Sequence, residues 1–127
     1  MSKKFDELKR VFDKLHSPDG CMWDLKQTHE SLIKYLKEET GEFISAVKSR
    51  DTENMKEELG DILLQVMFHS QIAKKQGKFT IEDVIDTLTK KLKRRHPHVF
   101  AGKKVKSVDE ILSNWKKIKK SEKKNGN

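Results

Sequence analysis

The apolar residues of this chain recur at helical spacing along most of its length, and this pattern restricts the fold more than any other feature. Phe5, Leu8, Phe12 and Leu15 follow the spacing of an amphipathic helix. No segment shows the apolar–polar alternation that is typical of a strand. Two prolines and six glycines leave room for long helices. We therefore predict an all-α fold, a four-to-five-helix bundle with short connections.

Capping residues divide this pattern into five helices. Thr28, Asp51 and Ser107 are placed to cap the start of a helix, and Gly77 is placed to end one. Pro97 disfavours helical geometry in the residue before it. The predicted helices cover roughly residues 5–15, 29–48, 53–75, 81–95 and 108–120, with irregular segments at 21–27 and 96–102.

The single cysteine, Cys21, excludes an intramolecular disulfide and is typical of a reducing compartment. The first residues show no signal-peptide pattern, and no apolar run approaches the ~20 residues that a membrane span requires. We therefore expect a cytoplasmic protein that has no membrane partner.

The net charge of +8 is concentrated at the C-terminal end, where nine lysines stand against three acids from Ala101 onward. Such a segment can bind nucleic acid, but lysines without interleaved arginines and aromatic residues are more typical of a solvated end. We therefore predict one domain over residues 1–120 and a disordered basic tail over residues 121–127.

Four acids interrupt the apolar stripes of the second and third predicted helices. Glu39 lies within the stripe of the second helix with Glu42 at its edge, and Glu58 and Asp61 share one face of the third. Consecutive helices with a short connection pack antiparallel, so we expect the four carboxylates to lie close together. They cannot all stay ionised unless cations neutralise them. Oxygen ligands suit Mg²⁺, or Mn²⁺, better than zinc, so we predict a metal site formed by these four residues.

Several residues leave two interpretations open. The acids could be ordinary surface glutamates, although two pairs within apolar stripes favour a metal site. Glu38 points away from the stripe, and Gly41 either allows the close approach of a ligand or is simply tolerated. Trp23 could stack on a base or pack at the end of the bundle. Trp115 belongs to the core by its pattern, and His69 is interpreted as a hydrogen-bonded core histidine.

Beyond these patterns, the sequence resembles the MazG family. Glu38-Glu39-x-x-Glu42, followed after fifteen residues by Glu58-x-x-Asp61, is similar to the E-E-x-x-E … E-x-x-D signature of that family. The segments WDLKQTHESL at 23–32, EELGDILLQV at 57–66 and RRHPHVF at 94–100 also resemble it. The similarity extends from about Cys21 to Lys119 and is closest to a single-domain member. Met22 departs from it, because the family usually has proline there.

The resemblance implies a helical nucleoside triphosphate pyrophosphohydrolase that uses Mg²⁺. Such an enzyme hydrolyses a (deoxy)nucleoside triphosphate to the monophosphate and pyrophosphate by means of a metal-activated water. It also implies a homodimer or a higher homo-oligomer. The candidate catalytic residues are Glu38, Glu39, Glu42, Glu58 and Asp61, of which Glu38 is a base candidate only if the helical wheel misplaces it.

The nucleotide-contacting residues of the family would correspond here to Lys91, Arg95, Trp115 and Lys119, with Trp23 as a further candidate for stacking on the base. The sequence is also compatible with a different class of function, namely a non-catalytic module that binds nucleic acid or regulates another protein through its basic tail. Steep salt dependence of nucleic-acid binding would favour that module, whereas Mg²⁺-dependent release of pyrophosphate would favour the enzyme.

Overall fold

The computed structural model describes residues 2–124, and this part of the chain contains seven helices and no strand. The prediction of an all-α fold is therefore confirmed. None of the described helices combines the length and the apolar character needed to cross a membrane. The helices are α1 (Lys3–Leu15), α2 (Met22–Lys26), α3 (Ile33–Ser49), α4 (Thr52–Lys75), α5 (Ile81–Arg95), α6 (Pro97–Phe100) and α7 (Val108–Lys124).

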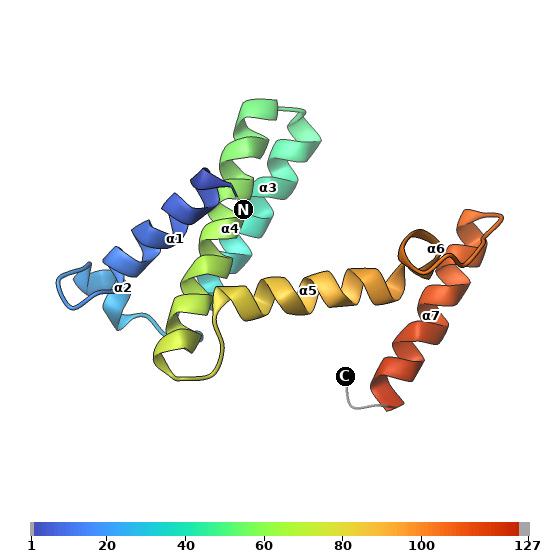
Figure 1. Cartoon of the computed structure of the whole chain (residues 1–127). Helices are drawn as coiled ribbons and strands as arrows, with labels where there is room; N and C mark the ends of the chain where they lie inside the picture. Colours follow the sequence, from blue (N-terminus) through green and yellow to red (C-terminus); the bar gives the residue numbers. More distant parts are fainter. Residues whose placement is uncertain (1, 125–127) are drawn as a thin grey trace. The chain divides into compact units, whose positions relative to one another are not determined.

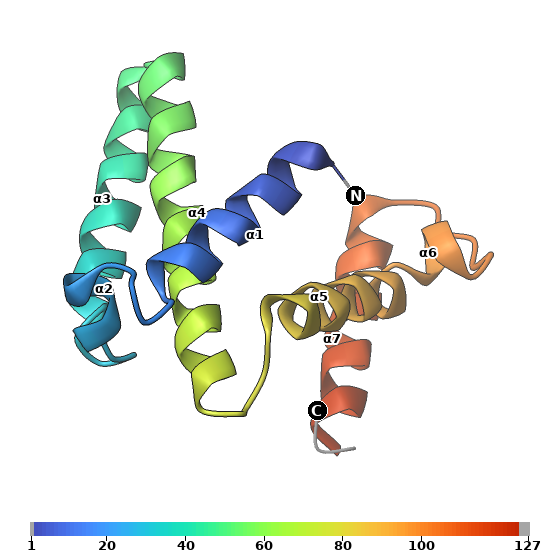
Figure 2. The ribbon, with the colours of Figure 1, turned by 60° about the vertical axis from the view of Figure 1, so that its left-hand side comes forward.

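The chain divides into two compact units, Met1–Ile81 and Glu82–Asn127. In the first unit, α3 and α4 form an antiparallel hairpin and α1 lies against α4 (Figures 1 and 2). The core of this unit joins α1, the segment before α3, and the second half of α4. Its buried residues are Phe12, Leu32, Met67, Phe68 and Ile72.

A two-residue connection reverses the chain between α3 and α4. Arg50 adopts a left-handed φ of 57°, which costs a side-chain-bearing residue roughly 1–2 kcal/mol, and its N–H caps the end of α3. Asp51 then accepts a hydrogen bond from the N–H of Asn54, so the prediction that Asp51 is an N-cap is confirmed. This tight reversal fixes which turns of α3 and α4 face each other.

Other predicted ends are confirmed as well. Gly77 follows α4 with a φ of 69°, a conformation that favours glycine. The hydroxyl of Ser107 accepts a hydrogen bond from the N–H of Glu110 at the start of α7.

The start of α3 differs from its prediction. Thr28 and Ser31 exchange two hydrogen bonds between side chain and backbone, which close a separate turn, and the helix begins only at Ile33. The segments predicted to be irregular also contain the short helices α2 and α6. Pro97 opens α6, because its fixed φ suits the first position of a helix.

The C-terminal end of α7 also differs from its prediction. The helix continues through Ser121–Lys124, where we expected a disordered tail, and Glu122 within this stretch is buried. The rest of the predicted tail, residues 125–127, lies outside the described residues. In the second unit, Glu122 forms ion pairs with Arg94 and Arg95, and the ring of His96 packs edge-on against Trp115.

A pair of histidines holds the segment before α3 against α4. The Nδ1 atoms of His29 and His69 lie 2.8 Å apart and share a hydrogen bond, and the two rings are stacked. One nitrogen must donate the proton and the other must accept it, so the contact requires at least one neutral ring. His69 is thus hydrogen-bonded and half-buried, as its pattern indicated.

We predict that this histidine pair makes the stability of the first unit sensitive to acid. Burial, together with the charge of His29, lowers the pKa of His69 below its ordinary 6.5. A depressed pKa means that this stabilisation is complete above about pH 6.5 and is lost as the pH falls through the folded-state value. We expect the melting temperature to fall more between pH 7.5 and 5.5 in the unmodified chain than in His69→Asn. His98→Asn is the control and should behave like the unmodified chain; parallel curves for all three proteins would contradict the account.

Candidate metal centre

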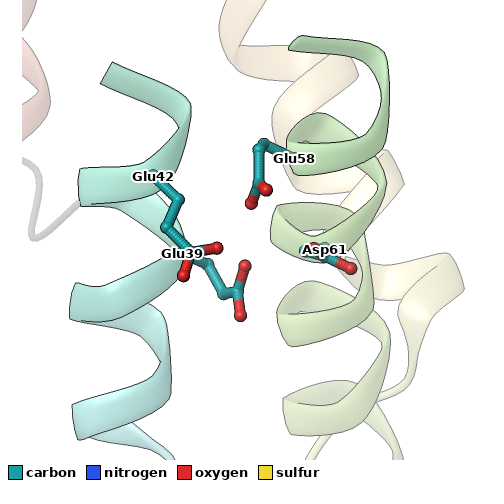
Figure 3. A group of neighbouring side chains, drawn as sticks. All are labelled: Glu39, Glu42, Glu58 and Asp61. Atoms are coloured by element: carbon teal, nitrogen blue, oxygen red, sulfur yellow. The ribbon is translucent and has the colours of Figure 1, made fainter. Parts of the chain in front are cut away.

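The α3–α4 hairpin brings the four predicted carboxylates together. Glu42 and Glu58 are equally distant from residue 50 at the reversal, as are Glu39 and Asp61, so each pair lies at the same level of the antiparallel hairpin. Glu39 and Glu42 extend from α3 toward Glu58 and Asp61 on α4 (Figure 3). One carboxylate oxygen of each residue lies within 4.8 Å of the corresponding oxygens of the other three. The predicted proximity is therefore observed, and metal binding remains a prediction.

Burial and mutual repulsion disfavour the ionised forms of these carboxylates. Glu58 is only 8% exposed, and its burial, with the neighbouring carboxylates of Glu42, Glu39 and Asp61, raises its pKa to about 7. Burial and the charges of Asp61 and Glu42 also raise the pKa of Glu39. Within the described residues, Oε2 of Glu39 and Oε2 of Glu58 are buried without a hydrogen-bond partner. The cluster thus has buried acceptors that a donor or a cation would satisfy.

The donor set fits a hard divalent cation. All four ligands are carboxylates, which suit Mg²⁺ or Mn²⁺, and no sulfur or imidazole ligand belongs to the cluster. Among residues 2–124, no lysine or arginine forms an ion pair with any of the four. A cation would therefore supply neutralising charge that no ion pair among the described residues provides.

An open hollow of about 660 Å³ adjoins the cluster. Glu42 and Glu58 form part of its wall, and Glu38, an exposed residue one turn before Glu42 on α3, lines it as well. A Cβ atom built on Gly41 would meet nothing within 4 Å, so no neighbouring part of the chain requires a glycine there. The two interpretations of Gly41, approach of a ligand and simple tolerance, both agree with this finding.

Sequence reasoning missed three other residues that line the hollow, namely Lys37, Ser45 and Asn54. Helical spacing could have found two of them. Ser45 is three residues after Glu42, and Asn54 is four residues before Glu58, so each shares a face with a predicted ligand. Lys37 adds a positive charge at the edge of an acidic site.

The predicted base-stacking residue Trp23 lies in α2 and packs on the core of the first unit. Its ring meets Tyr35 and Phe68 edge-on at centroid distances of 5.8 and 6.1 Å, while 48% of the residue stays exposed. These contacts agree with the packing interpretation, and the exposed half leaves stacking on a base open.

The remaining predicted nucleotide contacts lie in the second unit. Lys91 and Arg95 are one turn apart on α5, and Trp115 and Lys119 are one turn apart on α7. Arg95 is engaged by Glu122, and the indole Nε1 of Trp115 is buried without a hydrogen-bond partner among the described residues. The roles of these four residues toward a nucleotide remain predictions.

Comparison with known proteins identifies the family. The model of the MazG nucleotide pyrophosphohydrolase domain matches residues 27–100, more than half of the chain, and the match includes all four clustered carboxylates. This chain belongs to the MazG family. The resemblance seen in the sequence motifs is thereby confirmed.

Among the relatives of this MazG chain, a Thermotoga maritima protein is 56% identical over 119 residues and is named nucleoside triphosphate pyrophosphohydrolase/pyrophosphatase MazG. Proteins of Mycobacterium tuberculosis and Escherichia coli K12, each named nucleoside triphosphate pyrophosphohydrolase, are 50% and 38% identical over 115 and 120 residues. These alignments cover 94%, 89% and 94% of this chain but only 45%, 34% and 46% of the respective relatives. The chain thus spans less than half the length of these curated relatives.

The fold is also that of a MazG-related protein. The crystal structure of a mazG-related protein from Thermotoga maritima matches with a TM-score of 0.72 at 30% identity. The match covers 88% of this chain and 98% of that protein. The helical architecture predicted from periodicity is therefore one that this family adopts.

The Glu58→Gln variant should change stability in opposite directions with and without metal. The raised pKa of Glu58 means that its stabilising contribution is complete below about pH 4.5 and is lost as the pH rises through about 7. At pH 8 without metal, the variant should therefore melt at a higher temperature than the unmodified chain. Mg²⁺ should stabilise the unmodified chain by about 2.7 kcal/mol at a hundredfold excess over the dissociation constant, and the variant much less.

Thermal melting at pH 8 with EDTA or with millimolar MgCl₂ measures both effects. Glu53→Gln removes an exposed acid from the same helix and is the matched control, which should respond to Mg²⁺ like the unmodified chain. An equal Mg²⁺ response in all three proteins would exclude Glu58 from the metal site.

Proposed function

We propose that this chain hydrolyses (deoxy)nucleoside triphosphates to the nucleoside monophosphate and pyrophosphate in a Mg²⁺-dependent reaction that Mn²⁺ also supports. The observation that carries the proposal is the cluster of four carboxylates in a member of the MazG family, two of whose buried oxygens have no hydrogen-bond partner among residues 2–124. The names of the relatives point to the same activity. Chemistry on a triphosphate requires neutralisation of its charge, and a cation held by these carboxylates would provide it.

Glu39, Glu42, Glu58 and Asp61 would hold the cation. When bound, a divalent cation lowers the pKa of a coordinated water and neutralises charge on the departing pyrophosphate. The α3–α4 hairpin keeps the four carboxylates opposite one another, because the tight reversal at Arg50 and Asp51 fixes the register of the two helices. Glu38 lines the adjoining hollow and is the candidate that could accept a proton from the attacking water.

Residues outside the cluster would bind the substrate itself. Lys91, Arg95 and Lys119 offer positive charge to the phosphate groups. Trp23 and Trp115 offer aromatic faces to the base. The hollow beside the cluster is of a size and polarity that suit part of a nucleotide, and Lys37 and Asn54 add hydrogen-bond donors to its wall.

Pyrophosphate release tests the proposal directly. The natural ribo- and deoxynucleoside triphosphates and several modified ones should be screened with Mg²⁺, with Mn²⁺ and with EDTA. We expect release with at least one nucleotide, and none in EDTA. Glu39→Gln and Asp61→Asn should each lower kcat/KM by about a hundredfold or more, equivalent to roughly 2.7 kcal/mol, while retaining helical content. Glu53→Gln should keep its activity.

Near-full activity in either ligand variant would refute the assignment of the cluster. Absence of turnover with every nucleotide, combined with steeply salt-dependent binding of DNA or RNA, would instead support the non-catalytic module.

We further propose that the chain works in the cytoplasm as a homodimer or a higher homo-oligomer. The apolar stripe of α5 supports the oligomer, because none of its residues is buried, and Leu88 and Leu92 are 53% and 46% exposed. The free thiol of Cys21 and a nucleotide substrate agree with a reducing compartment.

Sedimentation equilibrium tests the oligomer. We expect a mass of at least twice 14.9 kDa, and Leu88→Glu should shift it toward the monomer because it places a charge on the apolar stripe. Lys90→Glu, on the exposed side of the same helix, is the control. A monomeric mass for the unmodified chain at micromolar concentration would contradict the proposal.

A further inference from the structure

Glu122 is a buried acid that joins the ends of two helices. Its side chain is 7% exposed, and it lies near the C-terminal end of α7. Oε1 accepts a hydrogen bond of 2.8 Å from Nη2 of Arg95, and Oε2 accepts one of 3.4 Å from Nε of the same residue. Oε2 also accepts a hydrogen bond of 2.5 Å from Nε of Arg94. A single carboxylate thus holds both arginines at the end of α5.

Helical spacing explains the burial of Glu122, because α7 continues to Lys124. Glu122 lies four residues after Ile118 and seven after Trp115, so it shares the apolar face of α7 although two lysines follow it and Lys119 and Lys120 precede Ser121. The hydrogen bonds from Arg95 and Arg94 lower its pKa to about 2, so it stays ionised at neutral pH. Glu122 can therefore act as a charged partner for both arginines at neutral pH.

The geometry of this contact leaves Arg95 able to bind an anion. A guanidinium has five N–H groups, and the bidentate contact with Glu122 uses one edge of it. The other edge can still donate to a phosphate, and its direction is fixed because the Arg95 side chain is only 24% exposed. A long side chain that is already ordered loses less entropy when it binds a ligand.

We propose that Glu122 is a positioning residue for substrate binding, which orients Arg95 toward the phosphate groups of the nucleotide. This role rests on the proposed function, since it assumes that Arg95 contacts the substrate. Two effects of Glu122 on binding oppose each other. Its negative charge weakens the attraction between Arg95 and a phosphate, whereas its contacts fix the guanidinium. The positioning role requires the second effect to be the larger.

The variant Glu122→Gln separates these effects, because it keeps the size of the side chain and removes its charge. We expect KM to rise about tenfold, within the range of one charge-assisted hydrogen bond, with kcat within about threefold of the unmodified value. In an Arg95→Ala background, the same substitution should change KM by less than about twofold, because Glu122 acts through Arg95. Asp109→Asn removes an acid from the other end of α7 and should leave both constants unchanged.

Binding of α,β-methylene-ATP with Mg²⁺, measured by titration calorimetry, provides a readout that does not depend on turnover. The affinity should fall about tenfold in Glu122→Gln, while circular dichroism shows unchanged helical content. A lower or unchanged KM in this variant, with an active unmodified chain, would overturn the positioning role alone. An equal rise of KM in the Arg95→Ala background would also overturn it. An unmodified chain that neither binds nor hydrolyses any nucleotide would overturn the proposed function together with this role.

Discussion

The antiparallel packing of α3 on α4 places four mutually repelling carboxylates opposite one another, and the candidate site depends on this packing. The hairpin places one oxygen of each acid within 4.8 Å of the others, and Glu58 among them is buried. Ordinary packing would not gather these charges, because each one disfavours ionisation of its neighbours. The fold tolerates them because the reversal at Arg50 and Asp51 and the core beneath α4 determine the register independently. The fold itself therefore brings the four carboxylates together, as the proposed cation site requires.

The second unit is held together in a different way. No apolar residue of α5 or α7 is buried, and the contacts within this unit include the ion pairs of Glu122 and the edge-on packing of His96 against Trp115. The same contacts involve Arg95 and Trp115, two of the residues expected to bind nucleotide. The same side chains would thus stabilise the second unit and bind the substrate. An arginine that is already ordered binds phosphate better than a mobile one, because it loses less entropy.

The sequence predicted the features that depend on local pattern. Periodicity gave the long helices, Asp51 and Gly77 gave their ends, and the apolar stripes around Glu39 and Glu58 gave the acidic cluster. Predictions from the sequence were wrong or missing where contacts between residues far apart in the chain determine the structure. Thr28 forms a separate turn with Ser31, so α3 begins later than predicted. The pairing of His29 with His69, forty residues apart, left no local signal. The lysine-rich segment from Ser121 was predicted to be disordered. The ion pairs that bury Glu122 within it come from Arg94 and Arg95 of α5, and local sequence does not reveal such partners.

The number of protons released when Mg²⁺ binds is the sharpest test of the proposed carboxylate site, because the cluster must exchange protons for a cation. Glu58, with a pKa of about 7 without metal, holds a proton at pH 6 in most molecules. Titration calorimetry with MgCl₂ in buffers of different ionisation enthalpy counts the protons released. We predict the release of about one proton per binding event at pH 6, falling toward zero by pH 8.5, with the release absent in Glu58→Gln. Mg²⁺ binding without proton release at pH 6, or no binding at all, would contradict the account.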